Sequence, residues 1–196
     1  MKIFTVQGPW AAGKSTLLAR LSNAYGNDIL PVSEFGVQER RTRDGFKLDI
    51  NKKDEFVANQ EIFHRAEYER VNRLREQGIE QVLFDRGPED TLCFSKIHPI
   101  AISAEWDVSA EMQRLAETYI SHRSTKILYL RASKETLTRR RKNDHTKPRK
   151  TFEEFVNLYY DLELEFYSKL PNVWFLDTDE MSGEDVMRGA VRYFGL

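Results

Sequence analysis

The hydrophobic residues of this chain fall into two alternating patterns. Five short runs are nearly continuous in apolar, β-branched and aromatic residues, which is typical of strands covered on both faces. Longer stretches between them have the spacing of helices. The pattern predicts strands at Lys2–Gln7, Asp28–Ser33, Gln81–Asp85, Lys126–Arg131 and Val173–Asp177. It predicts helices at Lys14–Tyr25, Lys53–Gln77, Ala104–His122, Ser133–Asn143, Phe152–Lys169 and Gly183–Phe194.

Strands that alternate with helices predict a parallel sheet with helices on both faces. The segments Thr151–Glu154 and Ser182–Asp185 have the sequence pattern of capping boxes at helix starts. The polar segments Gly36–Lys53 and Asn143–Lys150 lack periodicity and are expected to be functional loops. With 196 residues and no internal repeat, we expect a single α/β domain over residues 1–196.

Composition excludes several classes of protein. The chain has 30 Lys and Arg against 31 Asp and Glu, so its net charge of −1 argues against bulk binding of nucleic acid. The mean hydropathy is −0.59, and no apolar run approaches the roughly 18 residues of a membrane span. Met1–Val6 does not resemble a secretory signal, and Cys93 has no partner for an internal disulfide. We therefore expect a cytoplasmic enzyme without membrane contact.

The strongest motif follows the first predicted strand. Residues 8–15, Gly-Pro-Trp-Ala-Ala-Gly-Lys-Ser, match the phosphate-loop pattern G-x-x-x-x-G-K-[ST], between a strand and a helix as that motif requires. Lys14 is expected to reach the β- and γ-phosphates, and the Ser15 hydroxyl to bind Mg²⁺. Backbone N–H groups and the helix N-terminus complete the phosphate site. The residues expected to bind the nucleotide here are Gly8, Ala11, Ala12, Gly13, Lys14, Ser15 and Thr16.

The third predicted strand ends in Asp85, the usual position of a second carboxylate for Mg²⁺. Hydrolytic motors often place a water-activating Glu next, but here Arg86 follows, which suits an anionic phosphoryl group. The D-x-x-G pattern of GTP switches is absent at this position. The string Asn51–Asp54 matches N-K-x-D but precedes the carboxylate strand, so we interpret it as a chance match. These features favour phosphoryl transfer to a bound acceptor.

The order of these parts resembles the P-loop nucleoside and nucleotide kinases over essentially the whole chain. Pro31–Glu34 is similar to the segment that supplies the catalytic carboxylate of deoxynucleoside kinases, and Phe56–Gln60 to the helix whose glutamine reads the acceptor base. Asp85–Gly87 is similar to Glu-Arg-Ser of deoxynucleoside kinases and to Asp-Arg of thymidylate kinases. Arg139–Arg149 lies where that family has an arginine-rich lid, and Asp177–Asp179 where a loop packs against adenine.

The resemblance implies a three-layer P-loop NTPase fold with a five-stranded parallel sheet in the order 2-3-1-4-5. It also implies ATP as the phosphoryl donor, adenine contacts from Asp177 and Thr178, and a lid over residues 139–150. The sequence departs from the family pattern at Gly87. The sequence Asp85–Gly87 followed by Asp90 also resembles the corresponding segment of a looser set of P-loop kinases with varied acceptors.

The acceptor is left open between two chemistries. A hydroxyl acceptor needs a carboxylate to orient it and take its proton, and Glu34, at the carboxyl end of the second predicted strand, is the candidate. A monophosphate acceptor needs cations instead, and the basic cluster Arg40–Arg43 could supply them. We expect Trp10, Gln60 and Arg86, with Glu34, to contact the acceptor.

The basic run of the lid contains three consecutive arginines. One catalytic cation is worth roughly 10³–10⁵ in rate. Successive helical residues point about 100° apart, so the three side chains cannot all face the site. Among them we favour Arg139 and Arg141 as catalytic residues.

The leading hypothesis is an ATP- and Mg²⁺-dependent kinase of a hydroxyl acceptor, in the first place a (deoxy)nucleoside. The alternatives are a thymidylate-like nucleoside-monophosphate kinase and a kinase of another hydroxylated metabolite or antibiotic. A nucleotide-binding regulatory module without transfer activity and a polynucleotide 5′-end kinase remain as further classes. The helix predicted at Ala104–His122 is the candidate surface for a homodimer.

Overall fold

A single parallel sheet forms the centre of the molecule. The computed structural model describes the whole chain except residues 27, 33–44, 46–47, 120–121 and 144–151. Its strands lie in the order β2-β3-β1-β4-β5, as the resemblance implied. The three central strands are almost entirely buried, which explains why their sequences are continuously apolar. The strands are β1 (Lys2–Gln7), β2 (Leu30–Val32), β3 (Gln81–Asp85), β4 (Lys126–Arg131) and β5 (Val173–Asp177).

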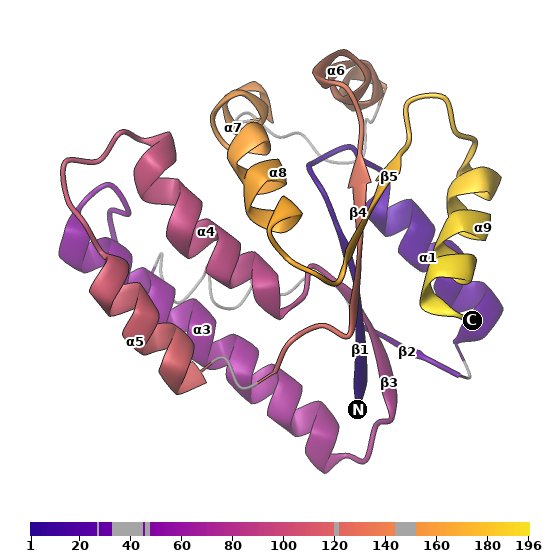
Figure 1. The fold of residues 1–196 in the computed structure, drawn as a ribbon, viewed down its shortest axis with the longest axis horizontal. Helices are drawn as coiled ribbons and strands as arrows, with labels where there is room; N and C mark the ends of the chain where they lie inside the picture. Colours follow the sequence, from indigo (N-terminus) through magenta and orange to yellow (C-terminus); the bar gives the residue numbers. More distant parts are fainter. Residues whose placement is uncertain (27, 33–44, 46–47, 120–121, 144–151) are drawn as a thin grey trace.

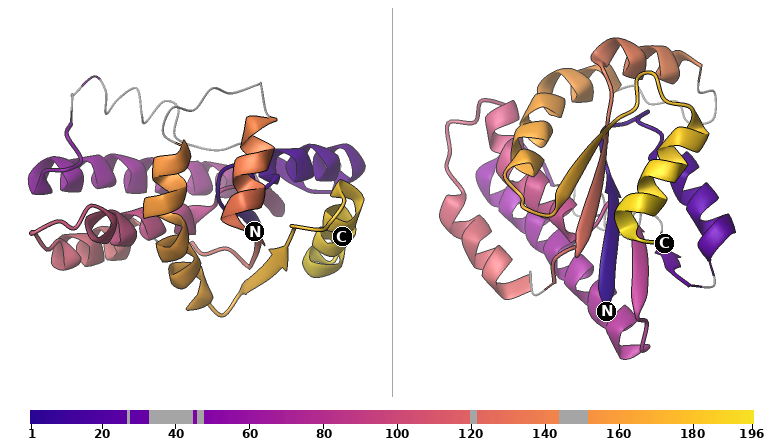
Figure 2. Two further views of the ribbon diagram at one scale, coloured as in Figure 1. Left: turned by 90° about the horizontal axis from the view of Figure 1, so that it is seen from above. Right: turned by 45° about the vertical axis from the view of Figure 1, so that its right-hand side comes forward.

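Helices cover both faces of the sheet (Figure 1). One layer consists of α1 (Lys14–Tyr25) and α9 (Gly183–Phe194), which pack on each other. The opposite layer holds α3 (Lys53–Glu76), α4 (Pro88–Ala101), α5 (Ser109–Tyr119) and α8 (Tyr160–Ser168). Both views in Figure 2 keep these two groups on opposite sides of the strands. In Figure 1, α6 (Lys134–Lys142) and α7 (Phe152–Leu158) lie beyond the carboxyl end of β4.

The edge strand β2 is shorter than the predicted Asp28–Ser33. The backbone N–H groups of Asp28 and Ile29 both donate to the carbonyl oxygen of Tyr25, so these residues form the turn that ends α1. Ser33 lies outside the described residues. The other four strands have the predicted bounds.

The helix predicted at Ala104–His122 is wrong in its first part. Within this region α5 begins only at Ser109, and the helix before it, α4, ends at Ala101 and was not predicted. Pro88 and Pro99 both lie within α4, and prolines in a sequence suggest interruption. At the first turn, however, proline is favoured because no N–H is needed there. The later start of α5 follows from Asp107, whose carboxylate accepts hydrogen bonds from the backbone and side chain of Ser109.

Two further helix predictions can be compared with the structure. The helix predicted at Phe152–Lys169 is divided at Tyr159 into α7 and α8. The capping box of α9 is confirmed, with reciprocal bonds between Ser182 and Asp185; the one that begins at Thr151 lies outside the described residues. No helix among the described residues has the length and apolar character to cross a membrane.

Candidate active site

The predicted phosphate loop connects β1 to α1 and requires its glycines. Gly8 has a φ of 134°, and a Cβ there would lie 2.2 Å from the carbonyl oxygen of Leu130 in β4. Gly13 has a φ of 100° and caps α1 at its N-terminus. The Lys14 ammonium group donates to the carbonyl oxygens of Gly8 and Pro9 at 2.8 and 2.9 Å. The loop therefore curls around a buried cation at the start of a helix, where anions bind.

Two oxygen-bearing side chains meet beside this loop. Ser15, in the first turn of α1, donates from its hydroxyl to Oδ2 of Asp85 at 3.5 Å. Asp85 ends β3 and lies opposite Val6 of β1 in the sheet register, which brings its carboxylate to the phosphate loop. A hydroxyl and one carboxylate are hard oxygen donors, and Mg²⁺ in nucleotide sites takes one or two such ligands together with substrate phosphates. The pair therefore fits Mg²⁺.

A cavity of about 640 Å³ opens over the phosphate loop. This volume lies in the range of small-molecule sites, roughly 300–1,000 Å³. Arg20, Met181, Gly183 and Val186 extend the cavity along α1 and α9. Most of the predicted site residues line this one space, whereas Gly8 does not. The predicted nucleotide-binding residues among the lining are Ala11, Ala12, Gly13, Lys14, Ser15, Thr16 and Thr178, and the others are the predicted metal ligand Asp85, the predicted catalytic residue Arg141 and the predicted acceptor contact Trp10.

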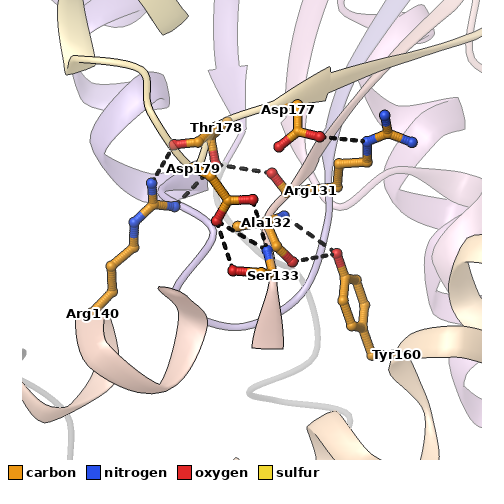
Figure 3. Close-up of polar contacts among 8 residues, drawn as sticks. All are labelled: Arg131, Ala132, Ser133, Arg140, Tyr160, Asp177, Thr178 and Asp179. Carbon is orange, nitrogen blue, oxygen red and sulfur yellow. Dashed lines mark hydrogen bonds and ion pairs between the residues drawn. The ribbon is translucent and has the colours of Figure 1, made fainter. Parts of the chain in front are cut away.

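The far end of this cavity is built where the loop after β5 meets α6 (Figure 3). Arg140 donates to the hydroxyl and the carbonyl oxygen of Thr178 at 3.0 and 2.5 Å. The Asp179 carboxylate accepts from the N–H and hydroxyl of Ser133, and hydrogen bonds from Thr136 and Ser133 lower the pKa of Asp179. Figure 3 also shows Asp177, which does not line the cavity and pairs with Arg131 at 3.4 Å.

The lid arginines are placed differently from the expectation. Arg140 and Arg141 line the cavity, whereas Arg139 donates to Thr136 and lines a separate surface with Lys134. The expected pair, Arg139 and Arg141, is two positions apart on α6 and so points about 200° apart, while neighbours differ by only about 100°. Adjacent arginines can therefore share a site more readily, and the structure shows that the adjacent pair at the cavity is Arg140 and Arg141.

Arg86 follows β3 directly and does not line this cavity; its backbone has a left-handed conformation with a φ of 61°. Its guanidinium donates to Oδ1 of Asp90 at 2.7 Å, and its carbonyl oxygen accepts from Arg70 of α3 at 3.3 Å. A non-glycine residue with positive φ persists when its surroundings hold it there. Glu163 of α8 lies nearby, and burial raises the pKa of its carboxyl group. The sequence analysis did not single out this residue.

The structure also explains the departure at Gly87. A Cβ at Gly87 would lie 2.2 Å from Oγ1 of Thr5 in β1 and 3.1 Å from Oγ of Ser124. Any larger residue there would force the β3–α4 turn away from β1. The glycine therefore reflects close packing of this turn against the sheet.

The other residues that were predicted to contact the acceptor do not lie together in one place. Gln60 is buried, and its side-chain oxygen accepts from Ser95 of α4 at 2.7 Å, which ties α3 to α4. Trp10 stacks on Phe155 of α7 with ring centroids 4.5 Å apart, besides lining the cavity over the phosphate loop. Glu34 and Arg40–Arg43 lie outside the described residues.

A protein-family model described as AAA domain matches residues 4–173. No curated protein sequence matches the chain significantly. Among solved structures, deoxyadenosine kinase from M. mycoides with bound dATP is similar over 100% of both chains, at a TM-score of 0.72 and 16% identity. The same enzyme with dCMP and dCDP is similar over 98% of both chains, at a TM-score of 0.71 and 18% identity. Thymidylate kinase from Candida albicans is similar over 99% of this chain and 91% of the kinase chain, at a TM-score of 0.71 and 13% identity. These likenesses establish a shared fold.

Proposed function

This chain belongs to the AAA domain family, and we propose that it is a kinase that transfers the γ-phosphoryl group of ATP to a hydroxyl acceptor, in the first place a (deoxy)nucleoside. The observation that carries the proposal is the convergence of the Lys14 loop, the Ser15–Asp85 pair and two lid arginines on one cavity. The residue after Asp85 is Arg86, which suits holding a phosphoryl group and cannot serve as the base for a hydrolytic water.

The residues around the cavity divide the work of transfer. Lys14 binds the β- and γ-phosphate oxygens from beneath, and Arg140 and Arg141 offset charge on the transferred group from the lid side. Ser15 and Asp85 would hold Mg²⁺, which when bound neutralises charge on the phosphate oxygens. Such fixed charges act mainly by positioning and electrostatic stabilisation, because phosphoryl transfer asks little covalent chemistry of the protein.

The acceptor hydroxyl requires a base, which we assign to Glu34. The oxygen of the acceptor hydroxyl forms a bond to the γ-phosphorus, and the bond between that phosphorus and the β–γ bridging oxygen breaks. The proton of the hydroxyl moves to the Glu34 carboxylate. ADP leaves with the bridging oxygen. Arg86 is proposed to hold the phosphoryl group during this transfer.

A nucleoside-monophosphate kinase is the second candidate, supported by the fold shared with thymidylate kinase. There the attacking phosphate oxygen is already ionised, so no base is needed and the Arg40–Arg43 cluster would hold the acceptor. A kinase of another hydroxylated metabolite or antibiotic would use the same residues as the nucleoside enzyme. A regulatory module would bind nucleotide tightly and release no ADP with any acceptor.

The first test is an acceptor screen with ADP release as the readout. We expect ADP release to depend on one acceptor class, and Lys14→Ala to abolish it. Lys169→Ala is the matched control, because Lys169 is exposed at the end of α8 and pairs only locally with Glu165. Failure of every nucleoside, monophosphate and alcohol to raise ADP release above background would refute the proposal.

Glu34→Gln separates the two acceptor chemistries. In a hydroxyl kinase this variant should lose roughly 10²–10⁴-fold in kcat, the usual contribution of a general base. In a monophosphate kinase its kcat should stay close to that of the unmodified protein. The comparison requires only the acceptor identified by the screen.

A further inference from the structure

A chain of hydrogen-bonded polar side chains leads from α8 to Arg86. Gln7, the last residue of β1, donates from Nε2 to Oδ1 of Asp90 at 2.6 Å and to Oε1 of Glu163 at 3.2 Å. The same Asp90 oxygen accepts from the Arg86 guanidinium at 2.7 Å. One amide therefore links a carboxyl of α8 to the carboxylate that pairs with Arg86.

This network is a poor source of stability. Gln7 and Glu163 are 0% and 3% exposed, and burial raises the pKa of the Glu163 carboxyl. Oε1 of Gln7 and Oε2 of Glu163 have no hydrogen-bond partner among the described residues. Buried polar atoms without partners destabilise the folded state, and apolar residues of the same size are often better tolerated there. The arrangement calls for a role other than stability.

The backbone of Arg86 is held independently of this network. Its N–H donates to the carbonyl oxygen of Val6 at 3.2 Å, and its carbonyl oxygen accepts from Arg70 at 3.3 Å. These contacts come from β1 and α3 and maintain the left-handed conformation. The direction of the guanidinium is a separate matter, since a long side chain keeps several rotamers unless its end is held.

We propose that Gln7 and Glu163 are positioning residues that orient Arg86 through Asp90. Glu163 holds the Gln7 amide, the amide holds the Asp90 carboxylate, and this carboxylate fixes the direction of the guanidinium. The role rests on the proposed phosphoryl transfer, in which Arg86 holds the transferred group. The same α7–α8 segment also contacts the loop through the stacking of Phe155 on Trp10.

The kinetic test uses Gln7→Met and Glu163→Met, which keep side-chain length and remove the hydrogen bonds. We expect each to lower kcat roughly tenfold, within the range of couplings in hydrogen-bonded networks, and to leave the KM for ATP nearly unchanged. Glu165→Met, an exposed position on the same helix, is the control and should match the unmodified protein. In an Arg86→Ala background, Glu163→Met should have no further effect on kcat. An equal loss in both backgrounds would assign Glu163 a merely structural role.

A second measurement does not need an acceptor. The Nη1–H signal of Arg86, the group that donates to Asp90, should exchange with water much faster in Glu163→Met than in Glu165→Met in nitrogen-15 NMR spectra, where its loss in Arg86→Lys identifies it. Should Glu163→Met fail to fold, Glu163→Gln keeps one acceptor oxygen and should give an intermediate exchange rate. An Arg86 signal that is identical in all folded variants would overturn the proposal, even where the acceptor screen succeeds. A failed screen with altered exchange would refute only the kinase assignment.

Discussion

The close approach of Gly87 to β1 makes Gly87→Ala a quantitative test of the turn that carries Arg86. A new Cβ would lie 2.2 Å from Thr5 Oγ1 and 3.0 Å from Thr5 Cγ2, whereas ordinary contacts begin at 3.4 Å. The turn, the strand or the Thr5 side chain must therefore move by about an ångström. Forced overpacking of this kind costs about 1–3 kcal/mol in the free energy of unfolding. For a protein of this size, that corresponds to a melting temperature roughly 2–12 °C lower.

Urea unfolding followed by circular dichroism measures this cost directly. Gly189→Ala is the control, because its Cβ would meet only the ends of side chains, the nearest being Cδ2 of Leu176 at 3.3 Å, and alanine is about 1 kcal/mol better than glycine in a helix. Thr5→Ala should restore most of the stability lost in Gly87→Ala, because it removes the atoms that clash. The reasoning is refuted by a Gly87→Ala protein within about 0.5 kcal/mol of the unmodified one, or by a loss that Thr5→Ala leaves unchanged.

Two more predictions concern the lid and a buried histidine. Arg140→Ala should lower kcat by roughly 10-fold or more and Arg139→Ala by less than about twofold, since only Arg140 lines the cavity; equal kinetics of the two variants would contradict this placement. Burial lowers the pKa of His64 to about 4 from 6.5, so the unfolded chain takes up the proton first as the pH falls, and stability is lost between these two values. At pH 5 the loss is about 2 kcal/mol relative to neutral pH. Urea titrations should show this loss attenuated in His64→Gln, and an identical pH dependence in the variant would disprove the assignment.

The strands and the phosphate loop were predictable because each depends on the types of a few consecutive residues. A strand buried on both faces needs a continuous apolar run, and such runs located β1, β3, β4 and β5 with their observed bounds. The loop around Lys14 needs glycines at positions of positive φ, so its pattern is written in consecutive residues. The strand order, by contrast, came from resemblance, since alternation of strands and helices does not specify which strands are neighbours.

Helix boundaries were predicted less well where the same residue type occurs both within a helix and at its end. Pro88 reads as a helix breaker in sequence, yet it starts α4 because the first turn needs no N–H there. Tyr159 continues the apolar pattern between α7 and α8 although the helix is divided at that residue. The pattern of apolar residues is the same for a continuous and a divided helix, because both bury the same face.

The sequence by itself determined the phosphate-loop pattern at Gly8–Ser15 and the carboxylate that ends the third strand. Both features depend on the conformation of a few consecutive residues. Only the tertiary structure brought Arg140 rather than Arg139 to the cavity, buried Gln60 against Ser95, and joined Glu163 to Gln7 across 156 positions of the chain. Those choices depend on how helices pack against the sheet, and packing is set by contacts between residues that are distant in the sequence.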